Sequence, residues 1–229
     1  MDEPLPPIPR LAALLADPAR ARIVWMLIDG TSRPAGELAY AAGISAQSAS
    51  GHLAKLVEGG LLESEAQGRH RYFRIAGPEV AAMLESMASV GVARIRSPRP
   101  TLPPATPVRF LYARTCYGHL AGEMAVNVLA SMLKARWLTV GGTDYDATAR
   151  GERELAALGV DVAATRHARR VFARACVDLT QRRPHLGGAL GDALLDVYVG
   201  RGWIHRSRRS RAVEITAKGN EGFRRTFDL

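Results

Sequence analysis

Cysteine is scarce in this chain of 229 residues, and long apolar runs are missing. Two cysteines, Cys116 and Cys176, are too few for the disulfide framework of a small secreted protein. No apolar run approaches the roughly 20 residues that a membrane-spanning helix needs. The first residues, MDEPLPPIPR, are too acidic and proline-rich for a signal peptide. We therefore expect a cytoplasmic protein with no membrane partner.

Acidic residues are in the minority. Lys and Arg number 31 against 22 Asp and Glu, which gives a formal net charge of +9. That charge favours a polyanionic partner, with nucleic acid ahead of an anionic membrane surface. Apolar residues make up 47% of the chain, so we expect a folded globular protein with one large or two small domains. A basic protein without such a partner is the alternative.

Motifs of common enzyme classes are also missing. The chain has no Gly-x-Ser-x-Gly elbow, no phosphate-binding loop and no His-Glu-x-x-His pair. Some methyltransferases begin with a winged-helix dimerisation domain, but TVGGTD is too short and isolated to be their cofactor loop. We therefore expect a protein that is not an enzyme.

The first sixty residues have the pattern of several short helices. Apolar residues follow helical spacing from Leu11 onward, and Asp17-Pro18 predicts an N-cap followed by proline at the first helical position. Gly30 is the expected end of that helix. A short helix then ends at Gly43, and Ser45 is placed to cap the next one. So tight a turn between two helices predicts a helix-turn-helix unit.

The second helix of this unit lies in ISAQSASGHLAKLVEGGLL, residues 44–62. Its first half is small and polar, and its second half is amphipathic. A helix in the major groove presents its N-terminal residues to base edges, where small hydrogen-bonding side chains allow close approach. An ordinary capped surface helix is the alternative. Residues 61–76 then alternate in strand fashion around Gln67-Gly68, which predicts a basic hairpin suited to phosphate contacts.

In order and spacing, these segments resemble the ArsR/SmtB family of winged-helix transcriptional repressors over residues 10 to about 95. The matching stretches are LADPARARIVWMLIDG, GELAYAAGISAQSASGHLAKLVEGGLLESEAQGRHRYFRIAG and the amphipathic EVAAMLESMASVGVARI. The resemblance implies a homodimer that binds double-stranded DNA and releases it when an inducer binds. Its last helix would help to form the dimer, or else pack only on its own domain. The residues expected to face DNA are Ser45, Gln47, Ser48, Ser50, His52, Lys55, Arg69 and Arg71.

The familiar metal sites of that family are absent here. The corresponding segments, SRPAGELAYA and PEVAAMLESM, contain neither Cys nor His. A proline-dense stretch, residues 96–107, predicts a semi-rigid linker. It would separate a DNA-binding and dimerisation domain, residues 1–95, from a C-terminal effector and packing domain, residues 108–229. Any sensor is expected in that second domain.

The second domain contains an internal repeat, with units at residues 108–165 and 166–229. RTCYGHLAG matches RACVDLTQRRPHLGG, and the His-to-Trp separation is 18 residues in both units (137 − 119 and 203 − 185). TARG and TAKG each begin an amphipathic helix, so each unit predicts a winged-helix-like fold. Chance similarity is the alternative. The expected fold class is mainly α with small β-wings (α+β), an N-terminal winged helix-turn-helix followed by two winged-helix-like repeats.

The repeats place Cys116 with His119, and Cys176 with His185, at matching positions. Brought together, these side chains would suit zinc or another thiophilic metal. Two nearby cysteines would alternatively form a redox-sensitive disulfide. The interpretation that the pattern favours over both is two buried structural cysteines, with histidines that cap helices or form hydrogen bonds in the core.

The sequence therefore predicts a dimeric repressor, released from its operator by a small-molecule, metal or redox effector. A tandem-winged-helix architectural or interaction protein without sequence preference is the alternative. An enzyme with a winged-helix dimerisation domain ranks below both.

Overall fold

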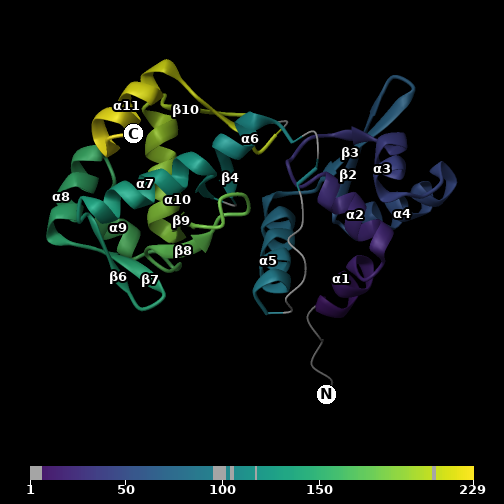
Figure 1. Cartoon of the computed structure of the whole chain (residues 1–229), viewed down its shortest axis with the longest axis horizontal. Coiled ribbons are helices and arrows are strands. Elements are labelled where there is room, and N and C mark those ends of the chain that lie inside the picture. Colours follow the sequence, from purple (N-terminus) through teal and green to yellow (C-terminus); the bar gives the residue numbers. More distant parts are fainter. Residues whose placement is uncertain (1–6, 95–101, 104–105, 117, 208–209) are drawn as a thin grey trace. The chain divides into compact units, whose positions relative to one another are not determined.

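The computed structural model describes residues 7–94, 102–103, 106–116, 118–207 and 210–229. The chain forms two compact units, Met1–Ala105 and Thr106–Leu229, which we describe separately as unit 1 and unit 2 (Figure 1). Most of the predicted linker, residues 96–107, lies outside the described residues. In the part of the chain that is described, no helix is both long enough and apolar enough to cross a membrane.

Over its described residues, unit 1 combines five helices with a three-stranded antiparallel sheet in the order β1-β3-β2. Its elements are α1 (Ile8–Leu15), α2 (Pro18–Met26), β1 (Arg33–Pro34), α3 (Ala35–Ala42), α4 (Ala46–Glu58), β2 (Leu62–Gln67), β3 (His70–Ile75) and α5 (Pro78–Arg94). Helices α3 and α4 form the helix-turn-helix, and the β2–β3 hairpin is the wing. The winged helix-turn-helix fold is thus as the sequence predicts.

Local rules set the helix boundaries of unit 1. The Asp17 carboxylate accepts a hydrogen bond from the backbone N–H of Arg20 at 2.9 Å, which starts α2 as predicted. Gly43, at φ 70°, ends α3 in the left-handed region, where glycine carries no steric penalty. The prediction that α2 continues to Gly30 was wrong. The α-helix ends at Met26, and the chain continues to Gly30 in tighter turns, in which the backbone N–H groups of Leu27 and Ile28 donate to the carbonyl oxygens of Val24 and Trp25.

The core of unit 1 fixes the orientation of α4. Ala49, Leu53 and Leu56 are buried on one side of this helix against α2 and α3. Burying a leucine side chain stabilises a fold by about 1.5–3 kcal/mol, so these anchors leave little freedom for α4 to rotate. The opposite side of α4 is therefore held towards solvent.

Unit 2 contains the same order of elements twice. The first half comprises α6 (Val108–Tyr112), β4 (Arg114–Cys116), β5 (His119–Ala121), α7 (Glu123–Lys134), β6 (Leu138–Gly141), β7 (Asp144–Ala147), α8 (Ala149–Leu158) and α9 (Val162–Arg166). The second comprises β8 (Arg174–Val177), β9 (Pro184–Gly187), α10 (Gly188–Gly200), β10 (Ile204–Arg206), β11 (Val213–Ile215) and α11 (Ala217–Phe227). Each half has a hairpin, a helix, a wing-like hairpin and a Thr-capped helix, in agreement with the sequence repeat.

Each of the two repeats contains the same close backbone contact. Thr148 caps α8 by accepting from the N–H of Gly151 at 3.0 Å, and a Cβ on Gly151 would lie 1.8 Å from the carbonyl oxygen of Trp137. Only glycine fits so close to a neighbouring backbone. The second repeat has the same arrangement at Thr216, Gly219 and Trp203.

Helices α7 and α10 are buried in one core that both repeats share. The sequence predicts that they bury against each other, but each also lies on a strand of the other repeat. Helix α7 packs on β9, and α10 packs on β5. This exchange brings the β4–β5 and β8–β9 hairpins together within unit 2.

Candidate DNA interface and candidate metal centre

The first half of α4 presents a polar surface. Ser45, Gln47, Ser48 and Ser50 are exposed, and so is Lys55 one turn further on. The serine hydroxyls form hydrogen bonds with the backbone of their own helix. The Ser45 hydroxyl accepts from the backbone N–H of Ser48 at 3.2 Å, and the Ser50 hydroxyl donates to the carbonyl oxygen of Ala46 at 3.0 Å. The surface is therefore slim, since its serine side chains fold back on the helix.

His52 lies differently from the other residues predicted on α4. Its side chain is half-buried, and its Nδ1 is 3.7 Å from Oδ1 of Asp17 at the start of α2. One residue before the buried Leu53, His52 lies at the edge of the packed face of α4. The contact with Asp17 holds the ring beside the core-facing side of the helix.

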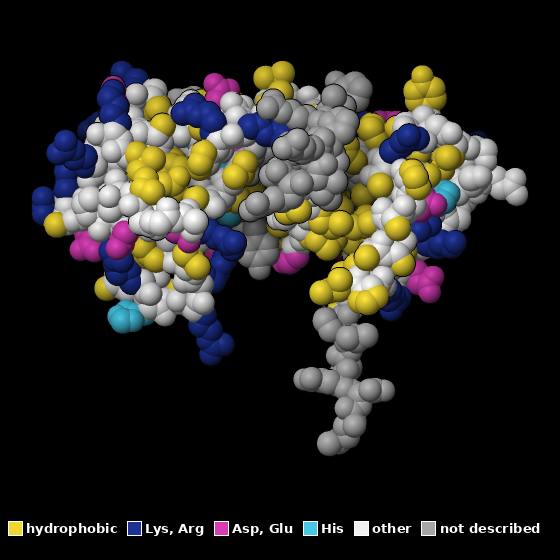
Figure 2. All heavy atoms as spheres, turned by 60° about the horizontal axis from the view of Figure 1, so that its bottom comes forward, with side chains coloured by type: hydrophobic (Ala, Val, Ile, Leu, Met, Phe, Trp, Pro, Cys, Tyr) yellow, Lys and Arg dark blue, Asp and Glu magenta, His cyan; other side chains and the backbone are white. Residues whose placement is uncertain are grey.

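The wing carries exposed basic side chains. Arg69 and Arg71 are exposed, and no ion pair joins either of them to the residues described here. Arg74, by contrast, pairs with Glu63 across the hairpin at 2.7 Å. The hairpin projects from the helices of unit 1 (Figure 1), and basic side chains stand out on the molecular surface with acidic ones between them (Figure 2). Arg69 and Arg71 are thus available to an anionic partner.

Helix α5 carries an apolar stripe that its own unit covers only in part. Leu84 is buried and Val80 and Met83 are half-buried, whereas Met87 is 50% exposed and Val90 is 55% exposed. Packing within unit 1 therefore explains why the stripe is apolar as far as Leu84, but it does not explain the apolar residues Met87 and Val90 at its end.

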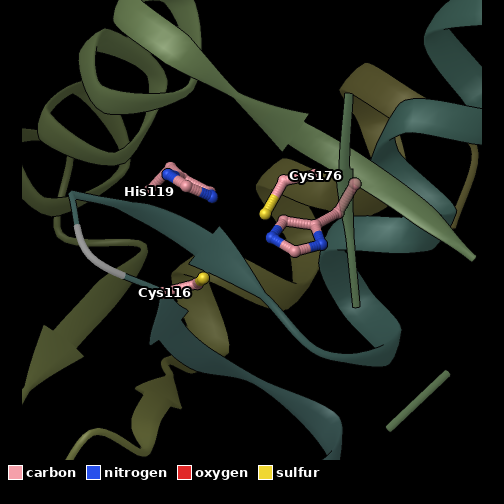
Figure 3. Close-up of side chains that lie close together, drawn as sticks. Cys116, His119 and Cys176 are labelled. Carbon is pink, nitrogen blue, oxygen red and sulfur yellow. The ribbon is translucent and has the colours of Figure 1, made fainter. Parts of the chain in front are cut away.

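In unit 2, the structure brings together all four residues singled out by the repeat. They form what we call the cysteine–histidine cluster: Cys116, His119, Cys176 and His185. Cys116 is the cross-strand partner of His119 in β4–β5, and Cys176 is that of His185 in β8–β9. One potential ligand atom from each side chain lies within 4.8 Å of all the others. The labelled side chains surround a common space (Figure 3), and the two cysteines form no disulfide.

Both histidine rings of the cluster are buried. His119 is 5% exposed and His185 is 1% exposed, and their ring centroids are 5.1 Å apart. No ring nitrogen of either has a hydrogen-bond partner among the residues described. Each Nδ1 faces a carboxylate instead, with 3.7 Å from His119 to Oδ1 of Asp192 and 3.6 Å from His185 to Oδ2 of Asp178. The Nε2 atoms are the ones left for a ligand.

The surroundings of His119 favour its charged form. Burial by itself lowers the pKa of His119, but the neighbouring Asp192 carboxylate and Cys116 thiol outweigh burial and raise the pKa to about 9. A metal ion that binds the ring therefore competes with its proton.

A fully buried ion pair lies behind the cluster and joins the two repeats. Nη2 of Arg114, in β4, is 2.9 Å from Oδ1 of Asp178, which follows β8. Backbone N–H groups of Gly122, Thr180 and Gln181 also donate to this carboxylate. Burial raises the pKa of Asp178, but the positive Arg114 and the N–H donors outweigh it and hold that pKa well below its usual range.

Sequence reasoning missed both carboxylates that face the histidines. Asp192 lies between buried residues in the first half of α10, and an acidic residue in that apolar stretch is a signal that could have been used. Asp178 lies two residues after Cys176, which gave no comparable signal. Two thiols and two imidazoles are the donor set that thiophilic metals prefer.

Comparison with known proteins covers nearly the whole chain. Residues 15–65 match the family model described as a helix-turn-helix domain. The uncharacterised helix-turn-helix-type transcriptional regulator YdfF of Bacillus subtilis is 38% identical over 226 residues, 98% of each chain. The chain belongs to the helix-turn-helix transcriptional regulators. As a member of this family it is a DNA-binding regulator of transcription.

Other relatives of the regulator match a smaller share of the chain. The transcriptional regulator CmtR of Mycobacterium bovis is 36% identical over 84 residues, 37% of this chain and 70% of CmtR. The homodimeric winged helix-turn-helix DNA-binding domain of Mb0332 from M. bovis is 28% identical, with a TM-score of 0.36 over 41% of this chain and 87% of that domain. The antimony-specific repressor AntR is 26% identical, with a TM-score of 0.35 over 39% of this chain and 81% of AntR.

Proposed function

We propose that this regulator is a repressor that reads a DNA operator through the first half of α4. The observation that carries the proposal is the slim polar surface of Ser45, Gln47, Ser48 and Ser50, held outward by a buried face. A major groove about 12 Å wide admits one helix, and a bulky N-terminal half would keep its backbone away from the base edges. Gln47 is the longest of these side chains and the one we assign to a base.

Basic residues around this surface are assigned to the phosphate backbone. Lys55 on α4 and Arg69 and Arg71 on the wing are exposed, so they can reach an anionic strand at little cost in desolvation. Phosphate contacts fix the position of a protein on the duplex but carry no sequence information. His52 takes the same role only if its ring leaves Asp17.

The repressor is proposed to act as a homodimer through α5. Met87 and Val90 are exposed on a single chain, and a second copy would cover both in a two-fold interface. A symmetric dimer presents two copies of α4 to half-sites one helical turn, about 34 Å, apart. The regulator would act in the cytoplasm, with the DNA that it reads.

Unit 2 is proposed to sense the signal that releases the operator. It carries the cysteine–histidine cluster, and its long helices α7 and α10 lack the small polar surface of α4. The effector classes that fit are a metal, a small molecule and an oxidant. Cys116→Ser should keep operator affinity but lose the response to a metal or an oxidant, and an unchanged response would exclude both.

A gel-shift experiment tests operator reading. The full chain is mixed with DNA from upstream of its own coding region, with unrelated DNA as competitor. A repressor should hold its operator on the order of 10³-fold more tightly than the competitor. Equal, strongly salt-sensitive binding to every DNA would overturn the proposal and favour an architectural role.

A further inference from the structure

The hairpins β4–β5 and β8–β9 meet at the cysteine–histidine cluster, where each contributes one thiol and one imidazole. We propose that this cluster binds one Zn2+ ion with tetrahedral geometry and so links the two repeats of unit 2. The inference deepens the proposed sensing role by naming the class of ligand. It rests on that proposed function only for the effect on DNA.

The size of the cluster fits such an ion. Zinc binds sulfur at about 2.3 Å and imidazole nitrogen at about 2.0 Å, so the edges of the tetrahedron are about 3.3–3.8 Å long. The four ligand atoms here already lie within 4.8 Å of one another. Side-chain shifts of about 1 Å therefore complete the site without any movement of the strands.

The two histidines are oriented as metal ligands are. A buried ring nitrogen without a hydrogen-bond partner is unfavourable, and neither nitrogen has a partner in His119 or in His185 within the described part of the chain. A metal ion at Nε2 gives each ring one partner. The proton on Nδ1 then points at Asp192 or Asp178, as in the carboxylate–histidine–metal arrangements of known sites. We therefore assign these two aspartates as positioning residues.

Glycines leave the room that the His119 ring needs. A Cβ on Gly187 would lie 3.2 Å from Nε2 of His119 and 3.4 Å from Cβ of Cys176. A Cβ on Gly191 would lie 3.0 Å from Cβ of His119. The backbone at Gly187 therefore lies close against the His119 ring, whereas Gly191 is confined first by the carbonyl oxygen of Leu186, 2.5 Å from such a Cβ.

The donor set selects the class of metal. Two thiolates balance the charge of a divalent ion in a buried place, and each thiol releases its proton to solvent when the ion binds. Magnesium and calcium require oxygen ligands, whereas sulfur and nitrogen in a tetrahedron favour zinc. With all four positions filled by protein, the ion has no open position for catalysis.

Metal analysis of the reduced full chain tests the site. The protein is loaded with Zn2+, freed of excess ion and measured for metal content, and Co2+ is used as a spectroscopic probe. We expect one ion per chain and the visible absorption bands of tetrahedral Co2+. Cys116→Ser and His185→Gln should abolish both, while His167→Gln, at an exposed histidine of the same unit, should retain both.

The positioning role has its own test. Asp192→Asn should weaken Zn2+ binding about 10–100-fold in a chelator competition and leave the Co2+ bands in place. If circular dichroism shows that Cys116→Ser does not fold, the Asp192→Asn variant still tests the zinc site. A folded wild-type chain that takes up no zinc, or an Asp192→Asn variant of unchanged affinity, would overturn the proposal. So would consumption of both thiols by a disulfide in the presence of zinc.

Gel shifts of the zinc-loaded and zinc-free chain separate the two proposals. Operator binding by a chain that binds no zinc would overturn the metal site and leave the repressor intact. Zinc bound by a chain that reads no operator would leave the site standing and overturn the repressor. A change in operator affinity on loading would support both together.

Discussion

Replacing Arg114 with methionine should destabilise unit 2 by about 3–5 kcal/mol. The guanidinium is fully buried and lies 2.9 Å from an equally buried Asp178 carboxylate. Removing one partner of such a pair leaves an uncompensated charge in the interior, which accounts for this magnitude. Backbone N–H groups of Gly122, Thr180 and Gln181 remain as donors to the carboxylate, so we expect a value near the lower limit.

Urea unfolding followed by tryptophan fluorescence measures this cost. The chain has three tryptophans, and a Trp25→Phe background confines the signal to Trp137 and Trp203 in unit 2. With a slope of about 2 kcal/mol per molar urea, a loss of 3 kcal/mol lowers the midpoint by about 1.5 M. Any bound metal is removed before unfolding, so that metal binding at the cysteine–histidine cluster does not contribute to the measured stability.

A second variant tests the reasoning behind the number. Adding Asp178→Asn to Arg114→Met removes the unpaired charge and keeps an oxygen that accepts from the backbone. The double variant should therefore recover more than half of the lost stability. A midpoint shift below about 0.5 M for Arg114→Met, or a double variant no more stable than the single one, would refute the argument.

Three further predictions concern the wing, the repeat and the dimer. Arg71→Ala should weaken binding to all DNA sequences alike and reduce the slope of log affinity against log salt by about 1. Arg74 is already paired with a glutamate, so Arg74→Ala should change little in the same titrations. Gly151→Ala should cost about 3 kcal/mol in urea unfolding because its Cβ meets a backbone carbonyl, whereas Gly141→Ala, with open space around its Cβ, should cost less than about 0.5 kcal/mol; equal costs would contradict the close contact. Met87→Asp should shift the chain from dimer to monomer in sedimentation equilibrium, and a dimer of unchanged affinity would exclude α5 as the interface.

Features decided by local chemistry could be predicted from the sequence. The caps at Asp17 and Ser45, the left-handed Gly43 and the β2–β3 hairpin all follow from residues within one turn of the chain. The end of α2 did not, because the chain between Met26 and Gly30 tightens to i→i−3 hydrogen bonds, which the spacing of apolar residues does not distinguish from an α-helix. Local rules identify an element more reliably than its last residue.

The cysteine–histidine cluster was predictable for a different reason. Equivalent residues of a pseudo-symmetric repeat meet where they lie close to the symmetry axis, so the matching positions of Cys116 and Cys176 suggested the cluster, on condition that the two hairpins pack together. The carboxylates could not be predicted in this way, because Asp192 and Asp178 do not occupy equivalent positions in the repeats. The two carboxylates lie beside the histidine rings because α10 packs against β8, and the spacing of residues in the sequence does not indicate that packing.

The most direct test of operator reading compares the affinity of wild type and Gln47→Ala for the operator and for a scrambled duplex of equal length. If Gln47 contacts a base edge, its loss should cost about 1–3 kcal/mol on the operator, a factor of about 5–150, and leave the scrambled duplex almost unaffected. Equal losses on both duplexes would contradict the assignment of α4 as the element that reads the sequence.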